Sequence, residues 1–188
     1  MLNRRSLLAG MAGIAIAGPA SAASRAIIDN QVHVALNRMF AQLPETRDLA
    51  ARAPGMLMMP SVLKSGFFFG GAYGEGALLT GVAPQHTPPA AGYYSLVSLS
   101  FGLQFGAQTT SHALFFMTQE ALERFQHADG WKVGADAEVT WPGDGRTVQT
   151  DSTLNNSPVI GLVFSQDGLL IGASLEGAKY SRIVFKEG

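Results

Sequence analysis

The sequence predicts an α+β protein in which N-terminal amphipathic helices precede a mostly antiparallel, twisted, barrel-like sheet with one inserted helix. Three observations support this class. Apolar residues recur at intervals of three and four over residues 24–43, short apolar runs broken by glycine dominate after residue 55, and residues 118–127 return to a helical pattern. Because no composition shift or tandem repeat divides the chain, we expect residues 23–188 to form one domain.

Residues 1–22 have the pattern of a cleaved export signal. Arg4 and Arg5 precede an apolar run rich in alanine and glycine, and small residues follow up to Ala22, after which we expect cleavage. The paired arginines resemble a twin-arginine signal, with an ordinary secretory signal as the alternative. No cysteine follows the apolar run, so we expect no lipoprotein attachment site. The expected location is the periplasm, with the protein soluble or peripheral to a membrane.

The N-terminal part of the mature chain is predicted to be helical. The first helix, residues 24–43, is expected to be amphipathic, with apolar positions at Ile28, Val32, Leu36, Met39, Phe40 and Leu43. Asp29, His33 and Asn37 recur every four residues on another face of this helix. A short second helix is expected over residues 44–53, because proline suits a first helical turn.

Glycine and proline divide the remainder into predicted strands. The runs at 56–59, 67–69 and 77–79 are expected to be strands with bends or bulges, the first stopping at Pro60, and residues 82–92 form a proline-rich loop. Further strands are expected at 93–105, 113–117, 159–164 and 169–173. Thr118 is expected to cap the inserted helix, and Asp167-Gly168 to form a hairpin turn.

The composition excludes several classes of protein. The chain is 47% hydrophobic and 14% charged, which is typical of a folded chain, and the absence of cysteine excludes disulfide scaffolds and thiolate metal sites. The net charge of −1 argues against nucleic acid as a partner. Removal of residues 1–22 leaves 11 basic and 14 acidic residues, so the mature chain carries −3.

Candidate catalytic and metal-binding groups are weak. Glu120, Glu123 and His127 share one helix face, which is typical of a solvated surface more often than of a metal or acid–base site. Five glycines lie close together but between strand-like runs, which favours bent strands over nucleotide binding: Gly66, Gly70, Gly71, Gly74 and Gly76. No nucleophile elbow occurs. We therefore expect no enzyme activity, cofactor or metal. Trp131 and Trp141 are interpreted as core or hairpin residues rather than membrane-interface residues.

Several segments resemble, in order, the motifs of the SYLF family. The stretch APGMLMMPSVLKSGF at 53–67 resembles the opening motif of the family, and the resemblance continues through GGAYGEGALL at 70–79. The later segments are GYYSL at 92–96, SFGLQFGAQ at 100–108, ALERF at 121–125, GADA at 134–137 and SQDGLLIGASLEG at 165–177. The eukaryotic members bind lipids and, in some proteins, actin. The resemblance implies a non-enzymatic module that binds membrane lipids, among them anionic phospholipids and phosphoinositides, with an amphipathic N-terminal helix involved.

The implied function gives two hypotheses. In the first, a periplasmic, envelope-associated protein contacts lipid through Arg25, Ile28, Val32, Arg38, Met39, Phe40 and Lys64. The alternative is a protein-interaction or structural module of the envelope without a lipid ligand, with the loop at 84–89 and the phenylalanine run at 67–69 as its surfaces. The disposition of residues 24–43 separates the two interpretations. An apolar face turned outward favours membrane contact, whereas a face packed on the sheet removes its main physical argument.

Overall fold

Three helices and eight strands make up the described residues, and the predicted α+β class is confirmed. The computed structural model describes residues 22–66, 69–83, 86–101, 106–140, 157–170 and 177–185. The helices are α1 (Ala22–Gln42), α2 (Thr46–Arg52) and α3 (Gln119–His127). The strands are β1 (Gly55–Gly66), β2 (Phe69–Thr80), β3 (Ala90–Phe101), β4 (Gly106–Phe116), β5 (Trp131–Lys132), β6 (Val159–Ser165), β7 (Gly168–Leu169) and β8 (Lys179–Arg182).

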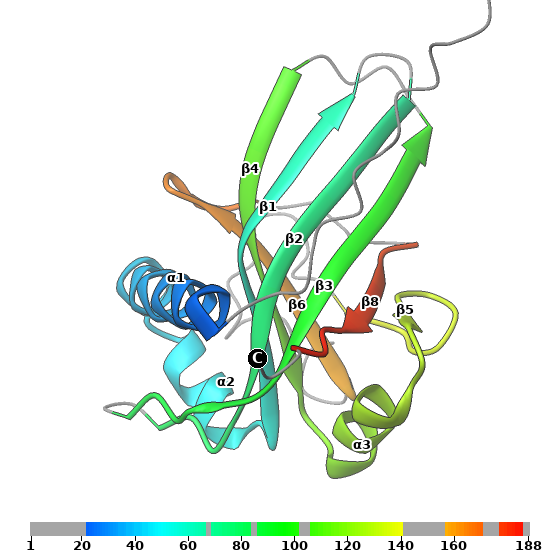
Figure 1. Cartoon of the computed structure of the whole chain (residues 1–188). Helices are drawn as coiled ribbons and strands as arrows, with labels where there is room; N and C mark the ends of the chain where they lie inside the picture. The colour runs from blue at the N-terminus through cyan, green and yellow to red at the C-terminus, as the bar shows by residue number, and fades with distance from the viewer. Residues whose placement is uncertain are drawn as a thin grey trace, which may run out of the picture.

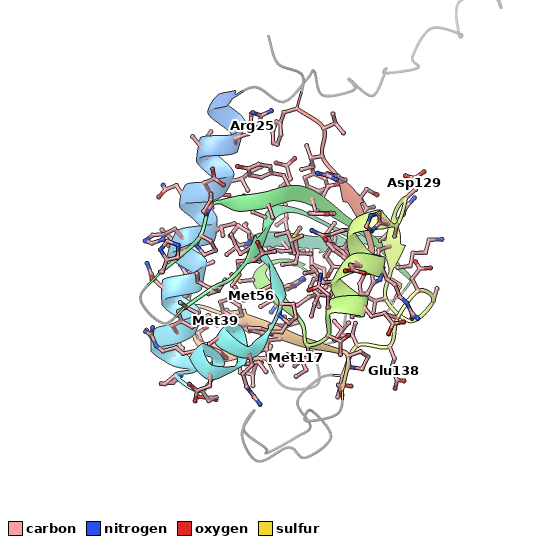
Figure 2. The ribbon with its side chains drawn as sticks, turned by 90° about the horizontal axis from the view of Figure 1, so that it is seen from below. Arg25, Met39, Met56, Met117, Asp129 and Glu138 are labelled. Carbon is pink, nitrogen blue, oxygen red and sulfur yellow. The ribbon has the colours of Figure 1, made fainter. Side chains whose placement is uncertain are left out.

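These strands form one curled half-barrel sheet in the order β5-β8-β3-β2-β1-β4-β6-β7, and the paired strands run antiparallel (Figure 1). The long strands β1 to β4 occupy the centre and extend past the helices at one end (Figure 1). We call this the distal end, where β1 ends at Gly66 and β3 ends at Phe101. The sheet lies between α1 on one side and α3 on the other (Figure 2).

Both faces of the sheet carry an apolar core at the end opposite to the distal one. Under α1, the buried side chains of the helix and sheet include Ile28, Val32, Leu36, Met39, Phe40, Met56, Met58 and Ala77. On the other face, Trp131 is 2% exposed and its ring lies 5.4 Å from that of Phe125 and 5.8 Å from that of Tyr180. Trp131 is therefore a core residue, as predicted, and it helps to hold α3 against the sheet.

The first strand does not stop at Pro60, so that expectation is wrong. β1 continues to Gly66, with a bulge that shifts its register against β2 between Met58 and Ser61. Proline lacks an N–H to donate, and a bulge is where a sheet tolerates that loss. The Pro60 carbonyl oxygen accepts a hydrogen bond of 2.7 Å from the Ser111 hydroxyl of β4. The bulge is thereby tied to the neighbouring strand.

Two glycines of β2 make room for this bulge. A Cβ atom on Gly76 would lie 2.1 Å from the Met58 carbonyl oxygen, and one on Gly74 would lie 2.8 Å from the Ser61 carbonyl oxygen. No side chain fits at such separations from backbone atoms. Both residues lie within a hairpin of strands, so the glycine cluster serves strand packing as expected. Gly71, in the same strand, has ordinary space, with the nearest atom 3.5 Å away.

Most other local predictions are confirmed. The Thr118 side chain accepts a hydrogen bond of 3.1 Å from the Ala121 amide and caps α3, and Asp167-Gly168 forms the turn between β6 and β7. Helices α1 and α2 lie within two residues of their expected ends. β3 begins at Ala90, inside the expected loop. Arg4, Arg5, Trp141 and most of the expected strand at 169–173 lie outside the described residues.

A buried histidine lies on the α3 side of the sheet. His112 is 3% exposed, its Nε2 lies 2.7 Å from the Thr110 hydroxyl, and its Nδ1 has no partner within the described part of the chain. Burial, together with the charge of Lys64, lowers the pKa of His112 from 6.5 to about 3. His112 is therefore neutral in the folded protein over the whole physiological range.

The glycine at the bulge gives the first prediction. Replacing Gly76 with alanine should lower the free energy of unfolding by about 1–3 kcal/mol, because the added methyl group overlaps the Met58 carbonyl. The matched Gly71→Ala change should cost less than about 1 kcal/mol. Urea unfolding followed by circular dichroism measures both. Equal effects of the two substitutions would show that β1 and β2 do not approach closely at Gly76.

The neutral histidine gives the second prediction. In the unfolded chain His112 is protonated below about pH 6.5, whereas in the folded protein it is protonated only below about pH 3. Protons therefore bind preferentially to the unfolded chain between these values, and the free energy of unfolding falls as the pH is lowered through this window. The slope due to this group reaches at most about 1.4 kcal/mol per pH unit. His112→Gln should remove this part of the slope, whereas His127→Gln, on an exposed site, should not. Unfolding curves between pH 4 and 7 test it, and an unchanged slope in His112→Gln contradicts it.

Candidate functional site

The apolar face of α1 packs on the sheet rather than facing outward. Ile28, Val32, Met39 and Phe40 are 3%, 2%, 0% and 5% exposed, and all four belong to the core against the sheet. In this conformation they are not available to a membrane. The interpretation of these four side chains as a membrane-inserting face is therefore not supported, because the sheet already occupies that face.

The three predicted basic contacts do not form one cluster. The Arg25 guanidinium lies 4.7 Å from the centre of the Phe185 ring, near the start of α1. Arg38 is half-buried, three turns further along the helix. Lys64 alternates with Leu63 on β1 and acts on His112, so it lies toward the α3 side of the sheet. No two of these three basic residues lie close enough together to bind one lipid headgroup jointly.

Exposed apolar side chains gather on a different surface. Six large apolar side chains are exposed in the described part of the chain, and three form one row across the sheet: Leu63 (50%), Tyr73 (53%) and Val97 (48%). Leu63 pairs with Tyr73, and Tyr73 pairs with Val97, so all three point to the same face. This is the face that carries α1, beyond the part that the helix covers.

Two more of the six lie on α1. Ile27 (57% exposed) and Val34 (49%) are two turns apart, on the outer side of α1, roughly opposite the buried Ile28, Val32 and Met39. We call the sheet row of Leu63, Tyr73 and Val97, beside the part of the sheet that α1 covers, the apolar corner. The corner contains none of the seven residues predicted to contact lipid.

Charged side chains lie beside the corner. Lys179 of β8 pairs with Val97, and Lys132 of β5 pairs with Lys179, so two exposed lysines continue the row on the same face. Glu75, next to Tyr73 on the same face of β2, accepts a hydrogen bond of 2.5 Å from the Tyr73 hydroxyl. Burial, followed by the hydrogen bond and the negative charge of Glu75, raises the pKa of Tyr73 to about 12. The phenol therefore stays neutral at physiological pH.

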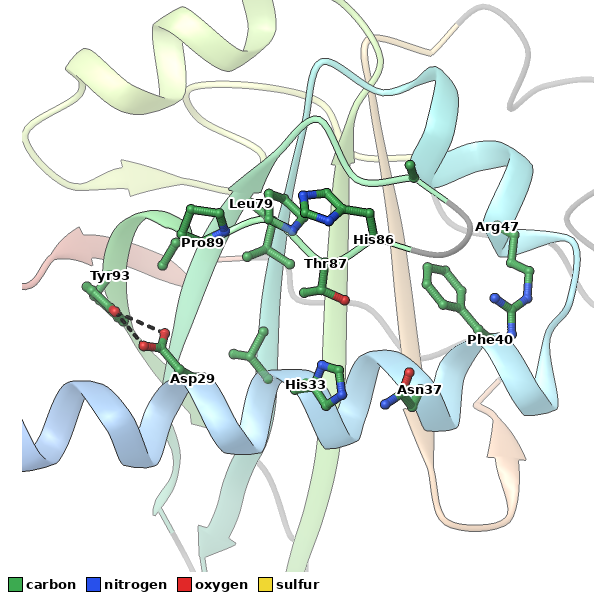
Figure 3. A pocket seen from close by; sticks show the side chains of 14 residues that line it. Asp29, His33, Asn37, Phe40, Arg47, Leu79, His86, Thr87, Pro89 and Tyr93 are labelled. Atoms are coloured by element: carbon green, nitrogen blue, oxygen red, sulfur yellow. Dashed lines mark hydrogen bonds between the residues drawn. The ribbon is translucent and has the colours of Figure 1, made fainter.

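A polar groove lies on the side of α1 away from the apolar corner. It has a volume of about 570 Å³ and runs between the helix and the loop residues 83 and 86–90, with Asp29, His33 and Asn37 along its helical wall (Figure 3). The Tyr93 hydroxyl lies 2.9 Å from each carboxylate oxygen of Asp29 and donates to them. Burial, then the hydrogen bond to Asp29, raises the pKa of Tyr93, so it remains a donor. The sequence pattern placed these three helix residues on one face but could not identify the opposite wall.

The helix face of Glu120, Glu123 and His127 is used for local pairing. Arg124 pairs with Glu120 at 2.5 Å, Gln119 donates to Glu123 at 3.0 Å, and His127 Nδ1 lies 2.8 Å from the Glu123 carbonyl oxygen. Among the described residues, no group of three or more His, Asp or Glu side chains is arranged to hold a metal. None of the helices in this part of the chain has the length and apolar composition needed to span a bilayer.

Comparison with known families covers the second half of this fold. Residues 97–183 match the model of the Ysc84 family, described as a Las17-binding protein actin regulator, which is the SYLF domain. No curated protein matches the chain. The match begins within β3 and extends just past β8, so it includes the motifs quoted above from residue 100 onward and not those at 53–96. SYLF domains form a family of binding modules that is not known for catalysis. The predicted resemblance is confirmed over residues 97–183, which are similar to the SYLF family.

Proposed function

We propose that this protein is a non-enzymatic, periplasmic lipid-binding module that contacts the envelope membrane peripherally through the apolar corner. The observation that carries the proposal is the row formed there by three of the six exposed large apolar side chains in the described residues. Contiguous exposed apolar surface on a folded protein marks a binding site more often than chance exposure. Similarity to the SYLF family supports lipid as the ligand class.

The shape of the corner suits the interfacial region of a bilayer. The sheet row presents Leu63, Tyr73 and Val97 side by side on one face. An amphipathic phenol such as Tyr73 is favoured at the headgroup level, where its hydroxyl stays hydrated while its ring is buried. Burial of several half-exposed side chains of this size contributes a few kcal/mol in total.

The charge of the protein favours contact driven by apolar burial over electrostatic attraction. The mature chain is expected to carry −3, and the predicted cations Arg25, Arg38 and Lys64 lie apart from one another. A basic residue near an anionic surface contributes about 1 kcal/mol, so the exposed Lys179 and Lys132, which continue the row beyond Val97, supply modest selectivity for anionic headgroups. We therefore expect a moderate dependence of binding on salt and on lipid charge.

A protein-interaction module remains the second candidate, and one observation favours it. Toward the distal end, β4 from Gly106 to Thr110 pairs with β1 but with no other described strand on its outer edge, since β6 begins to pair only at Ser111. An open strand edge can accept an extended peptide. The family description also names a protein-binding member. On this reading lipid is not a ligand.

Charged substitutions in the corner test the proposal. Tyr73→Asp together with Val97→Asp should reduce binding of the protein to vesicles of phosphatidylethanolamine and phosphatidylglycerol by about tenfold or more, because apolar burial is lost and charge must be desolvated. Co-sedimentation at low and high salt measures the change. The control is Val184→Asp, an 80% exposed apolar residue beyond β8. Equal binding by all variants would contradict contact through the corner, and no binding by the wild type would overturn lipid binding.

A covalent restraint on α1 separates contact through the corner from insertion of the buried face. The Gln42 side chain donates a hydrogen bond of 2.6 Å to the Gln166 carbonyl oxygen, so the end of α1 lies beside the β6–β7 turn. Because the chain has no cysteine, Gln42→Cys with Gln166→Cys gives one unique pair for a short bifunctional crosslinker. Crosslinked protein should bind vesicles as well as the uncrosslinked double variant does. Loss of binding on crosslinking would show that α1 must leave the sheet.

A further inference from the structure

The polar groove beside α1 contains side chains that the fold leaves unused. Within the described part of the chain, no hydrogen bond or ion pair engages the side chains of His33, Asn37, His86 or Thr87, although all four line the groove. They come from two walls, α1 and the loop residues 83 and 86–90, and face the same space (Figure 3). A volume of about 570 Å³ lies within the range of small-molecule sites. These four side chains point into the groove and are free to form hydrogen bonds with a ligand.

The walls of the groove are held in place by their own contacts. Tyr93 fixes the Asp29 carboxylate on the helical wall. On the loop wall, the Ala83 amide donates to the His86 carbonyl oxygen at 3.1 Å, and the His86 amide donates to Ala83 at 3.0 Å. Pro88 and Pro89 follow, and their rings restrict the backbone. Such preorganisation lowers the entropy cost of binding a ligand.

The two ends of the groove differ in charge. Asp29 and Tyr93 lie at one end, and Arg47 lies at the other (Figure 3). The Arg47 guanidinium is stacked 4.7 Å from the centre of the Phe40 ring, which orients its planar fork. A guanidinium in this geometry favours a carboxylate, sulfate or phosphate group. A carboxylate at the other end favours hydroxyl donors.

We propose that this groove binds a short acidic glycan, with sugar hydroxyls against Asp29, His33 and Asn37 and its acidic group at Arg47. Each sugar hydroxyl both donates and accepts hydrogen bonds, which matches a wall of carboxylate, imidazole, amide and hydroxyl groups. Between the polar rims, the rings of Pro88, Pro89 and Tyr93 line the groove with accessible apolar surface suited to the C–H face of a sugar ring. The separation of the charged ends calls for an elongated ligand rather than a single small anion.

Other ligand classes fit this groove less well. A metal ion would need three suitable ligands, and the described residues contain no such group. An extended peptide is recognised best by a free strand edge, whereas these walls are a helix and a loop in which Pro88 and Pro89 lack an amide donor. A lipid chain would meet too many polar groups. The glycan site is also independent of lipid contact, because the groove and the apolar corner lie on different sides of α1.

Calorimetric titration of the full chain with three probes tests the proposal. The probes are a disaccharide of glucuronic acid and N-acetylglucosamine, the neutral disaccharide N,N′-diacetylchitobiose, and inorganic phosphate. We expect saturable binding of the acidic disaccharide, at least tenfold weaker binding of the neutral one, and no competition by phosphate at equal concentration. No saturable sugar binding, or phosphate binding as tight as that of the acidic disaccharide, would overturn the glycan assignment.

Matched variants locate the binding. Asp29→Asn and His86→Ala should weaken binding of both sugars at least tenfold, whereas Arg47→Gln should mainly remove the preference for the acidic one. The controls are Asp48→Asn, His127→Ala and Arg52→Gln, which change the same residue types at exposed sites outside the groove. His86 is exposed on a loop, so its variant should fold normally, as circular dichroism can check. If His86→Ala and Asp29→Asn both bind like wild type, the sugar lies elsewhere and the proposal fails.

Discussion

The packing of α1 on the sheet is the interaction on which the other surface features depend. Ile28, Val32, Leu36, Met39 and Phe40 are almost fully buried against β1 and β2, and full burial of side chains of this size contributes about 1.5–3 kcal/mol each before entropy is counted. With that face committed to the core, only the two flanks and the outer side of the helix are left to a ligand. The polar groove lies along one flank, and the apolar corner lies on the sheet beside the other.

The bulge in β1 decides which side chains reach the corner. Before the bulge, Met56 and Met58 face α1; after it, the extra residue reverses the alternation, so that Leu63 faces that side and Lys64 faces the other. Without the bulge, Val62 would pair with Tyr73, and Lys64 would face the α1 side of the sheet opposite Gly71. The absence of side chains at Gly74 and Gly76 permits the bulge, because backbone atoms of β1 occupy the space that a Cβ would need. The two glycines of β2 therefore permit the bulge that places Leu63, rather than Val62, in the exposed row and keeps Lys64 off that face.

Local signals predicted the elements well and the surfaces poorly, for a physical reason. The period of α1, the Thr118 cap and the Asp167-Gly168 turn depend on neighbours in the sequence, and all three are confirmed. Whether Ile28 faces lipid or the sheet depends on a partner strand far along the chain, which helical periodicity does not encode. The apolar corner is even harder to predict from the sequence, because its residues become neighbours only through the register of three strands and the bulge in β1. The sequence pattern placed Asp29, His33 and Asn37 on one polar face of the helix. The loop that forms the other wall of the groove lies about fifty residues further along the chain, so the groove itself could not be predicted.

The two proposed sites are chemically different and lie on different sides of one helix. A sheet surface carrying Leu63, Tyr73 and Val97 gains by leaving water, whereas a groove lined by Asp29 and Arg47 favours groups that remain polar. Because the buried face of α1 separates the two sites, occupation of one does not require a movement of the other. If both proposals hold, a ligand that presents a glycan at a membrane surface is bound more tightly than either part alone, through effective concentration rather than through a change in shape.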